Sequence, residues 1–182
     1  MKAKFKYPNE TRSEAVNLTV KALQFRQEKT RAKTVNFATE NLVYEICSLL
    51  LAKHSEAYGK HVGCRFMSEQ AINIHRSYSK NTEQDLPFKK RVIHEHLYPK
   101  DRTIKDLFEI ITPEYDSVKT ILDERNIGVL LSIEENRSLD ALGFRFECNK
   151  IDIWERYRKA KIVTYNVTWE NKVIISSERV NS

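Results

Sequence analysis

One short segment of this chain places two imidazoles and a carboxylate directly behind a pair of apolar residues. Residues 91–99 read Arg-Val-Ile-His-Glu-His-Leu-Tyr-Pro, so His94, Glu95 and His96 follow a valine and an isoleucine. Taking such groups out of water costs free energy unless a cation or hydrogen bonds satisfy them. The segment therefore predicts that these side chains are used, as metal ligands or in proton transfer.

A second segment brings amide and carboxylate side chains to the start of a helix. Residues 126–136 run from one asparagine through an apolar stretch to a second, Asn136. Ser132 and Glu135 have the spacing of a capping box, which marks a helix N-terminus. Asn136 therefore lies in the first turn of the predicted helix, and Asp140 lies one turn further along the same face.

The strand end and the helix start together bring four polar side chains towards one point, which is enough for a divalent cation. Carboxylate and amide oxygens suit magnesium or manganese, whereas imidazole suits zinc, nickel or manganese, so this mixed set is typical of a catalytic centre. Phosphodiester hydrolysis needs a base for water, a cation and positive groups that hold the backbone. His96 suits the role of the base. The candidate phosphate contacts are Arg91, Lys100, Arg137, Arg156 and Arg158.

The elements that position these residues are a strand, a helical insertion, a second strand and a helix. Residues 90–97 are predicted as a strand that Pro99 ends, because proline cannot continue a ladder. Helices are expected over 101–111 and again from 112–113, where a threonine cap precedes a proline at the first helical position. Residues 127–131 form the second, short apolar strand.

The chain before this region is predicted to be helical, and the chain after it is predicted to be rich in β-strands. The polar stretch 79–84 lacks periodicity and is the predicted linker, which divides the chain into a helical part, 1–84, and a motif-bearing part, 85–182. Residues 161–175 alternate as in a β-hairpin whose turn is 170–172. The predicted fold class is α+β, with a helix-rich N-terminal part, a small ββα core interrupted by a helical insertion, and a C-terminal β-hairpin.

Composition limits the classes of protein that this chain can belong to. It has 182 residues, 41% hydrophobic and 31% charged, which suits a compact, helix-rich globule rather than a disordered chain. The formal charge of +6 favours a polyanionic partner such as DNA or RNA. Three cysteines without a Cys-x-x-Cys pair argue against a disulfide framework or a zinc ribbon and favour a cytoplasmic location. No apolar run approaches the roughly 20 residues of a membrane span, so no membrane partner is expected.

The two segments together resemble the motifs of the HNH, or ββα-metal, nucleases. Residues 95–99, Glu-His-Leu-Tyr-Pro, are similar to the opening Asp/Glu/His-His-x-x-Pro motif of that family, and residues 126–136 are similar to its closing motif. The resemblance implies a metal-dependent endonuclease in phage defence or mobile-element biology, with Mg²⁺ or Mn²⁺ as cofactor and Zn²⁺ or Ni²⁺ as alternatives. It implies these roles: Glu95 and Asn136 as metal ligands, His96 as general base, Asn126 as the residue that steadies the catalytic loop, and Asp140 as a further ligand. His94, beside them on the strand, is one more candidate ligand.

Other interpretations of the same residues stay open. His94 and His96 share one face of the strand and could be core histidines bonded to backbone carbonyls, while Asn136 only caps its helix. The chain would then be a basic module that binds nucleic acid or protein as a regulator. Arg156 and Arg158 either contact phosphate or cover aromatic residues with their stems. A hydrolase of small phosphoesters is a third class, and the sequence does not decide between a homodimer and a partner protein.

Overall fold

The computed structural model describes residues 8–79, 88–144, 149 and 151–180. These residues form an α+β fold, as predicted, that divides into two compact units, each built from segments far apart in sequence. The helical unit comprises Met1–Ala57 and Lys100–Ile127, and the sheet unit comprises Tyr58–Pro99 and Gly128–Ser182.

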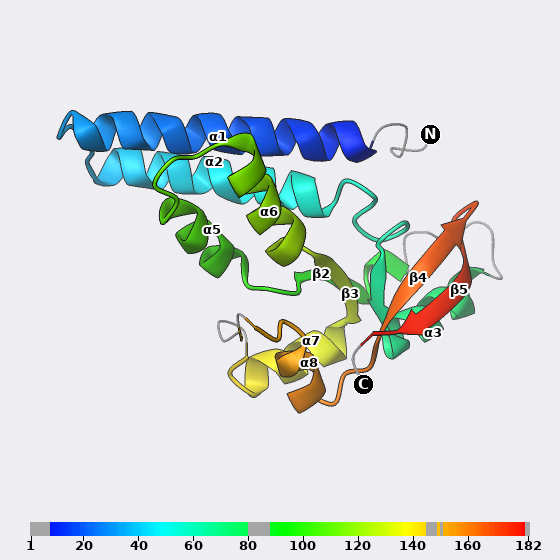
Figure 1. The fold of residues 1–182 in the computed structure, drawn as a ribbon. Helices are drawn as coiled ribbons and strands as arrows, with labels where there is room; N and C mark the ends of the chain where they lie inside the picture. The colour runs from blue at the N-terminus through cyan, green and yellow to red at the C-terminus, as the bar shows by residue number, and fades with distance from the viewer. Residues whose placement is uncertain (1–7, 80–87, 145–148, 150, 181–182) are drawn as a thin grey trace. The chain divides into compact units, whose positions relative to one another are not determined.

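Two long helices and two shorter ones make up the helical unit (Figure 1). Their bounds are α1 (Pro8–Arg31), α2 (Phe37–Ser55), α5 (Lys100–Phe108) and α6 (Tyr115–Arg125). Asn36 caps α2 by accepting a hydrogen bond from the backbone N–H of Thr39 at 2.9 Å. No helix in the described ranges is long and apolar enough to cross a lipid bilayer.

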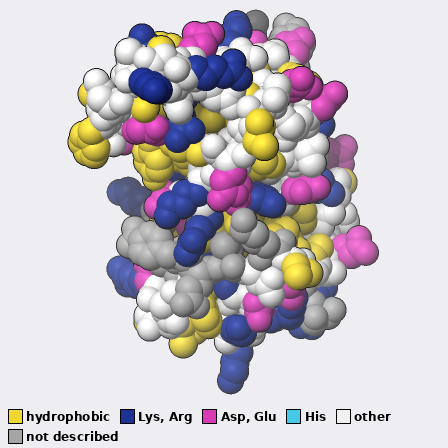
Figure 2. Space-filling model, turned by 60° about the vertical axis from the view of Figure 1, so that its left-hand side comes forward, with side chains coloured by type: hydrophobic (Ala, Val, Ile, Leu, Met, Phe, Trp, Pro, Cys, Tyr) yellow, Lys and Arg dark blue, Asp and Glu magenta, His cyan; other side chains and the backbone are white. Residues whose placement is uncertain are grey.

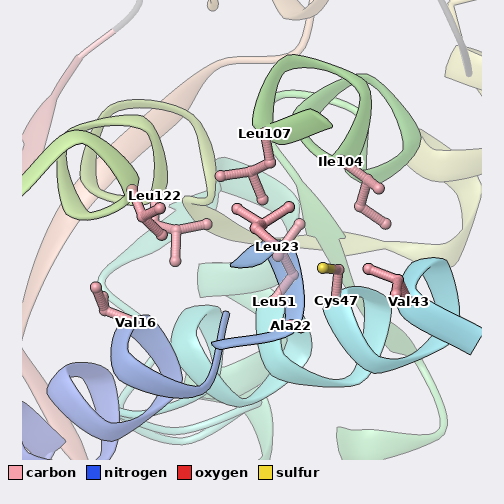
Figure 3. Packing of buried hydrophobic residues seen from close by; sticks show 10 residues of the cluster. Val16, Ala22, Leu23, Val43, Cys47, Leu51, Ile104, Leu107 and Leu122 are labelled. Atoms are coloured by element: carbon pink, nitrogen blue, oxygen red, sulfur yellow. The ribbon is translucent and has the colours of Figure 1, made fainter. Parts of the chain in front are cut away.

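The core of the helical unit is filled by side chains from all of these helices. Figure 3 shows Leu23, Leu51, Leu107 and Leu122 pointing into a common interior. Leu51, Leu107 and Leu122 are fully buried, and burying a leucine contributes about 1.5–3 kcal/mol relative to leaving it exposed. The helical insertion that follows β2 therefore completes the core that α1 and α2 begin.

This packing explains why the two units differ from the predicted division at residue 84. The sequence pattern places the segment 100–127 in the motif-bearing part, because it lies between the two predicted strands. In the structure its apolar face packs on α1 and α2 instead. Residues 58–79, assigned to the helical part, supply β1 and α3 of the sheet unit.

The sheet unit holds every strand of the described chain together with short helices. Its elements are β1 (Phe66–Ser68), α3 (Glu69–Ser79), β2 (Val92–His96), β3 (Gly128–Ser132), α7 (Ile133–Ala141), α8 (Glu155–Lys159), β4 (Thr164–Glu170) and β5 (Val173–Arg179). The strand order is β2-β3-β1-β4-β5, and only the pairing of β1 with β3 is parallel. β3 is buried along its whole length, which fits its apolar sequence. β2 and β5 are the edges of the sheet.

The predicted C-terminal hairpin is confirmed as β4 and β5. Trp169 pairs with Ile174 and Glu170 with Val173, so the loop consists of Asn171 and Lys172. Both loop residues have positive φ, 46° and 68°, as the tight turns of two-residue hairpins require.

Candidate functional site

The predicted strand end lies at an edge of the sheet. β2 pairs with β3 in antiparallel register, with Glu95 opposite Val129 and His96 opposite Gly128. The rings of His94 and His96 lie 5.7 Å apart, so both point to the same face of the strand. Because side chains alternate along a strand, Glu95 points to the other face. The carboxylate and the imidazole of neighbouring residues therefore leave β2 in opposite directions and do not meet on one side of the sheet, which differs from the expected convergence.

Glu95 forms an ion pair with Arg156 of α8. Arg156 Nη2 lies 2.8 Å from Glu95 Oε1 and also donates to the carbonyl of His96. Arg156 Nη1 donates to the carbonyl of Phe144 at 3.0 Å. The side chain of Arg156 is 3% exposed, against 25% for Glu95. The predicted contact of Arg156 with phosphate does not fit this position, because the guanidinium is enclosed by protein.

The charge of Arg156 is matched by its neighbours. Burial lowers the pKa of Arg156, but the nearby Tyr157 and Glu95 raise it, and the net shift is upward. Burial raises the pKa of the Tyr157 hydroxyl well above its ordinary value, so that hydroxyl keeps its proton. Its oxygen accepts a hydrogen bond from Arg156 Nη2 at 3.4 Å. Such additional bonds offset part of the cost of removing a charge pair from water.

The helix that follows β3 begins where the sequence predicted. Ser132 Oγ accepts from the backbone N–H of Glu135, and Glu135 Oε2 accepts from the N–H of Ser132 at 2.9 Å, which confirms the capping box. Asn136 is partly exposed in the first turn, and Asp140 is exposed in the last. α7 packs against both β2 and β3. The sheet unit therefore contains the predicted order of strand, strand and helix.

Glu135 has a further contact that the local pattern does not reveal. The hydroxyl of Ser68, at the end of β1, donates to Glu135 Oε2 and accepts from the N–H of Ala71 at the start of α3. One carboxylate thus links the starts of two helices. Burial raises the pKa of Glu135, although the donors around it favour the ionised form. No spacing rule could find this pair, since its members are 67 positions apart.

Asn126 lies in the helical unit, where it joins the ends of α2 and α6. It is 1% exposed, and its Nδ2 donates to the carbonyl of Leu51 at 2.8 Å and lies 3.2 Å from Nδ1 of His54. Because Nδ1 of His54 accepts from this amide, the proton of the neutral ring is on Nε2, 3.4 Å from Oδ1 of Asp123. Asn126 thus steadies two helix ends, and its proposed effect on a catalytic loop stays a prediction.

The buried ring of His54 makes stability depend on pH. Burial and the charge of Arg12 lower its pKa from 6.5 to about 4, although Asp123 and the backbone of Asn126 act in the opposite direction. Between these values the folded protein keeps the ring neutral while the unfolded chain protonates it. The free energy of unfolding is therefore expected to fall as the pH drops from about 6.5 to 4, by at most about 3 kcal/mol.

Urea denaturation at pH 7 and pH 4.5 measures this loss. The matched variant is His54→Asn, whose side-chain oxygen can still accept from Asn126 but which does not titrate. We expect its stability to change less over this range. An equal loss in both proteins would assign the effect to other groups.

The remaining candidate phosphate contacts lie in different surroundings. Arg91 and Arg137 are exposed. The carbonyl of Arg91 accepts a hydrogen bond from the first residue of α7 at 3.1 Å, and Arg137 lies in the middle of the same helix. Arg158 is exposed but pairs with Asp152. Lys100 begins α5 in the helical unit. On the face shown in Figure 2, Asp and Glu side chains are scattered among the Lys and Arg side chains.

Glu95 of β2 and Asn136 of α7 carry the oxygen donors that the sequence predicts for a cation. Within the described ranges, no group of three or more His, Cys, Asp or Glu side chains is arranged to hold a metal ion. Glu95 uses Oε1 for Arg156, and a carboxylate offers about four acceptor positions, so Oε2 can still bind a cation. Few protein ligands and several waters are the arrangement that Mg²⁺ prefers.

The ring of His94 leaves no room for a side chain at Gly128. A Cβ added at Gly128 would overlap His94 Nε2 and lie 2.5 Å from Cε1. Gly128→Ala is therefore expected to lower the free energy of unfolding by about 1–3 kcal/mol through overpacking. Denaturant unfolding of the two single variants and of Gly128→Ala with His94→Ala forms a double-mutant cycle. The alanine at 128 should cost less once the ring is absent, and an unchanged cost would show that the two residues do not interact.

Comparison with known proteins gives no match. No family model, no curated protein and no solved structure is similar to this chain. The resemblance to HNH nucleases therefore stays a hypothesis that depends on the residues of β2, β3 and α7.

Proposed function

We propose that the chain is a metal-dependent endonuclease that hydrolyses phosphodiester bonds of nucleic acid. One observation carries the proposal: β2 and β3 pair in antiparallel register, and α7 starts at the residue that follows β3. This order brings the segment 94–96 and the first turn of α7 onto neighbouring elements. It is the order that the resemblance to ββα-metal nucleases implies.

In this proposal His96 is the general base, and Glu95 and Asn136 bind Mg²⁺ or Mn²⁺. In-line displacement needs the attacking water and the leaving oxygen on opposite sides of phosphorus. β2 is an edge strand, and His96 and Glu95 leave it on opposite faces. A phosphodiester beside this edge would meet a base on one side and a cation on the other. The bound cation would stabilise negative charge on the phosphoryl and leaving oxygens.

The proposed contacts with the nucleic-acid backbone begin at and beside α7. Arg91 and Arg137 are exposed there, and each phosphate that they neutralise releases a counterion. Arg158 and Lys100 are further candidates. The affinity for nucleic acid should therefore fall as the salt concentration rises.

A second function is favoured by the ion pair at Glu95. A carboxylate that already holds a buried guanidinium is stable without a metal, and this would suit a protein that binds nucleic acid or another protein without cleaving it. In that case His94 and His96 would be structural, and chelators would have no effect.

Cleavage assays with the full chain separate the two functions. Single-stranded and double-stranded DNA and RNA are incubated with Mg²⁺, Mn²⁺ or EDTA, and binding is followed in parallel over a salt series. The nuclease requires cleavage that EDTA abolishes. Salt-sensitive binding that is insensitive to EDTA, without cleavage in either metal, would favour the regulator.

The setting of this activity belongs to the same proposal. Cys47 and Cys64, the two cysteines in the described part of the chain, are buried and form no disulfide, and the location that we propose is the reducing cytoplasm. A role in phage defence or mobile-element biology comes from the resemblance alone.

A further inference from the structure

Arg156 is a buried cation that forms an ion pair with Glu95, a residue of the proposed site. It lies on α8, a helix of five residues, and 4% of the surface of the whole residue is exposed. Its two terminal nitrogens bond acceptors that surround them, whereas Nε, which is also buried, has no hydrogen-bond partner among the described residues, so the position of the guanidinium is set by the partners of its terminal nitrogens.

The partners of Arg156 come from the two elements on which the proposed site depends. On β2 it bonds two consecutive residues, the side chain of Glu95 and the carbonyl of His96. Its other terminal nitrogen bonds the carbonyl of Phe144, which follows the C-cap of α7 at Leu142 by two residues. One side chain therefore ties the end of β2 to the chain that leaves α7.

These contacts restrict both residues that the proposal places at the reaction centre. The bond to Oε1 fixes the rotation of the Glu95 carboxylate and leaves Oε2 for a cation. The bond to the carbonyl of His96 fixes the backbone from which the imidazole extends. Holding ligands by a second set of hydrogen bonds is how metal and catalytic sites are kept in a productive geometry.

We propose that Arg156 is a positioning residue: its guanidinium orients Glu95 and the backbone of His96 relative to α7, and it does not contact phosphate. This inference rests on the proposed function. The planar fork is essential to it, because the flexible ammonium of lysine cannot hold three acceptors in fixed directions.

Arg156→Lys tests this, because it keeps the charge and removes the fork. Mn²⁺ affinity of the full chain is measured by electron paramagnetic resonance, beside nucleic-acid affinity over a salt series without metal. The matched control is Arg65→Lys, which changes an exposed arginine bonded to Asn166. We expect Arg156→Lys to weaken Mn²⁺ binding by about tenfold or more, with the affinity for nucleic acid and its salt dependence unchanged. Arg65→Lys should leave Mn²⁺ binding as it is.

Two results would overturn the inference. One is an Mn²⁺ affinity for Arg156→Lys equal to that of the unchanged protein. The other is a loss of nucleic-acid affinity whose salt slope falls by about one, which is the signature of a lost phosphate contact. If the unchanged protein binds no Mn²⁺ and cleaves nothing, the proposed function itself fails and the inference fails with it.

A measurement on the unchanged protein avoids any dependence on the folding of a variant. Mn²⁺ broadens nuclear magnetic resonance signals close to it, so the side-chain signal of Arg156 and the amide signals of Glu95 and His96 should broaden at low Mn²⁺, before those of Arg65. Broadening at Arg65 without broadening at Arg156 would place the cation elsewhere and contradict the inference.

Discussion

Replacing His96 with alanine is expected to lower the rate of metal-dependent cleavage by about 10²–10⁴-fold, the usual contribution of a general base. The side chain extends from the end of an edge strand and is partly exposed, so its loss should leave the core intact. Binding of Mn²⁺ and of nucleic acid should change little, because the proposed role of the imidazole is to accept a proton from water. Cleavage of a labelled oligonucleotide under single-turnover conditions measures the chemical step.

The control for this variant is His61→Ala, which removes a histidine of the same sheet unit that lies outside β2 and α7. His61→Ala should cleave at the rate of the unchanged protein. If His96→Ala also does so, with its fold verified by circular dichroism, His96 is not the base and the proposed mechanism is wrong.

Replacing Glu95 with alanine is expected to lower the free energy of unfolding by about 2–4 kcal/mol. Removing one partner of a buried ion pair leaves the other charge without compensation, and here Arg156 would keep only carbonyl and hydroxyl acceptors. The value lies below that of a fully buried pair because Glu95 is a quarter exposed. Glu95→Gln keeps an acceptor oxygen and should cost less.

Asp152→Ala provides the comparison at an exposed position: it removes the partner of Arg158 from an ion pair whose side chains are 36% and 37% exposed, together with one acceptor of the Trp154 N–H at 3.2 Å. Exposed pairs contribute about 0–1 kcal/mol, so its loss should be small. Guanidinium chloride denaturation of Glu95→Ala, Glu95→Gln and Asp152→Ala measures how much each variant lowers the free energy of unfolding. A loss in Glu95→Ala no larger than that in Asp152→Ala would mean that Arg156 does not depend on Glu95. Assays of the role of Glu95 in metal binding should use Glu95→Gln, because this variant keeps an acceptor for Arg156 and should lose less stability.

Some parts of the fold and of the candidate site could be predicted because their causes are local. The capping box of Ser132 and Glu135 spans four residues and fixes the start of α7 by itself. The loop of Asn171 and Lys172 needs two residues that accept positive φ between alternating strands. The shared face of His94 and His96 follows from the two-residue period of a strand.

Other parts could not be predicted because their partners are distant in sequence. Arg156 and Glu95 are 61 positions apart, and Asn126 and His54 are 72 apart. The sequence leaves two interpretations of Arg156 open, since a basic residue near aromatic residues can contact phosphate or cover the rings with its stem. A buried ion pair leaves no mark in local spacing, because burial depends on which elements pack around the side chain.

The sequence by itself determined the helices, the strand that carries residues 94–96, the helix start that carries Asn136, and the C-terminal hairpin. Each of these depends on hydrogen bonds and side-chain periods within a few residues. Only the tertiary structure decided that the insertion after β2 joins α1 and α2 in one core, and that Arg156 of α8 is the partner of Glu95. Those outcomes depend on burial of apolar surface and on pairing of buried charges across the whole chain, which no local window contains.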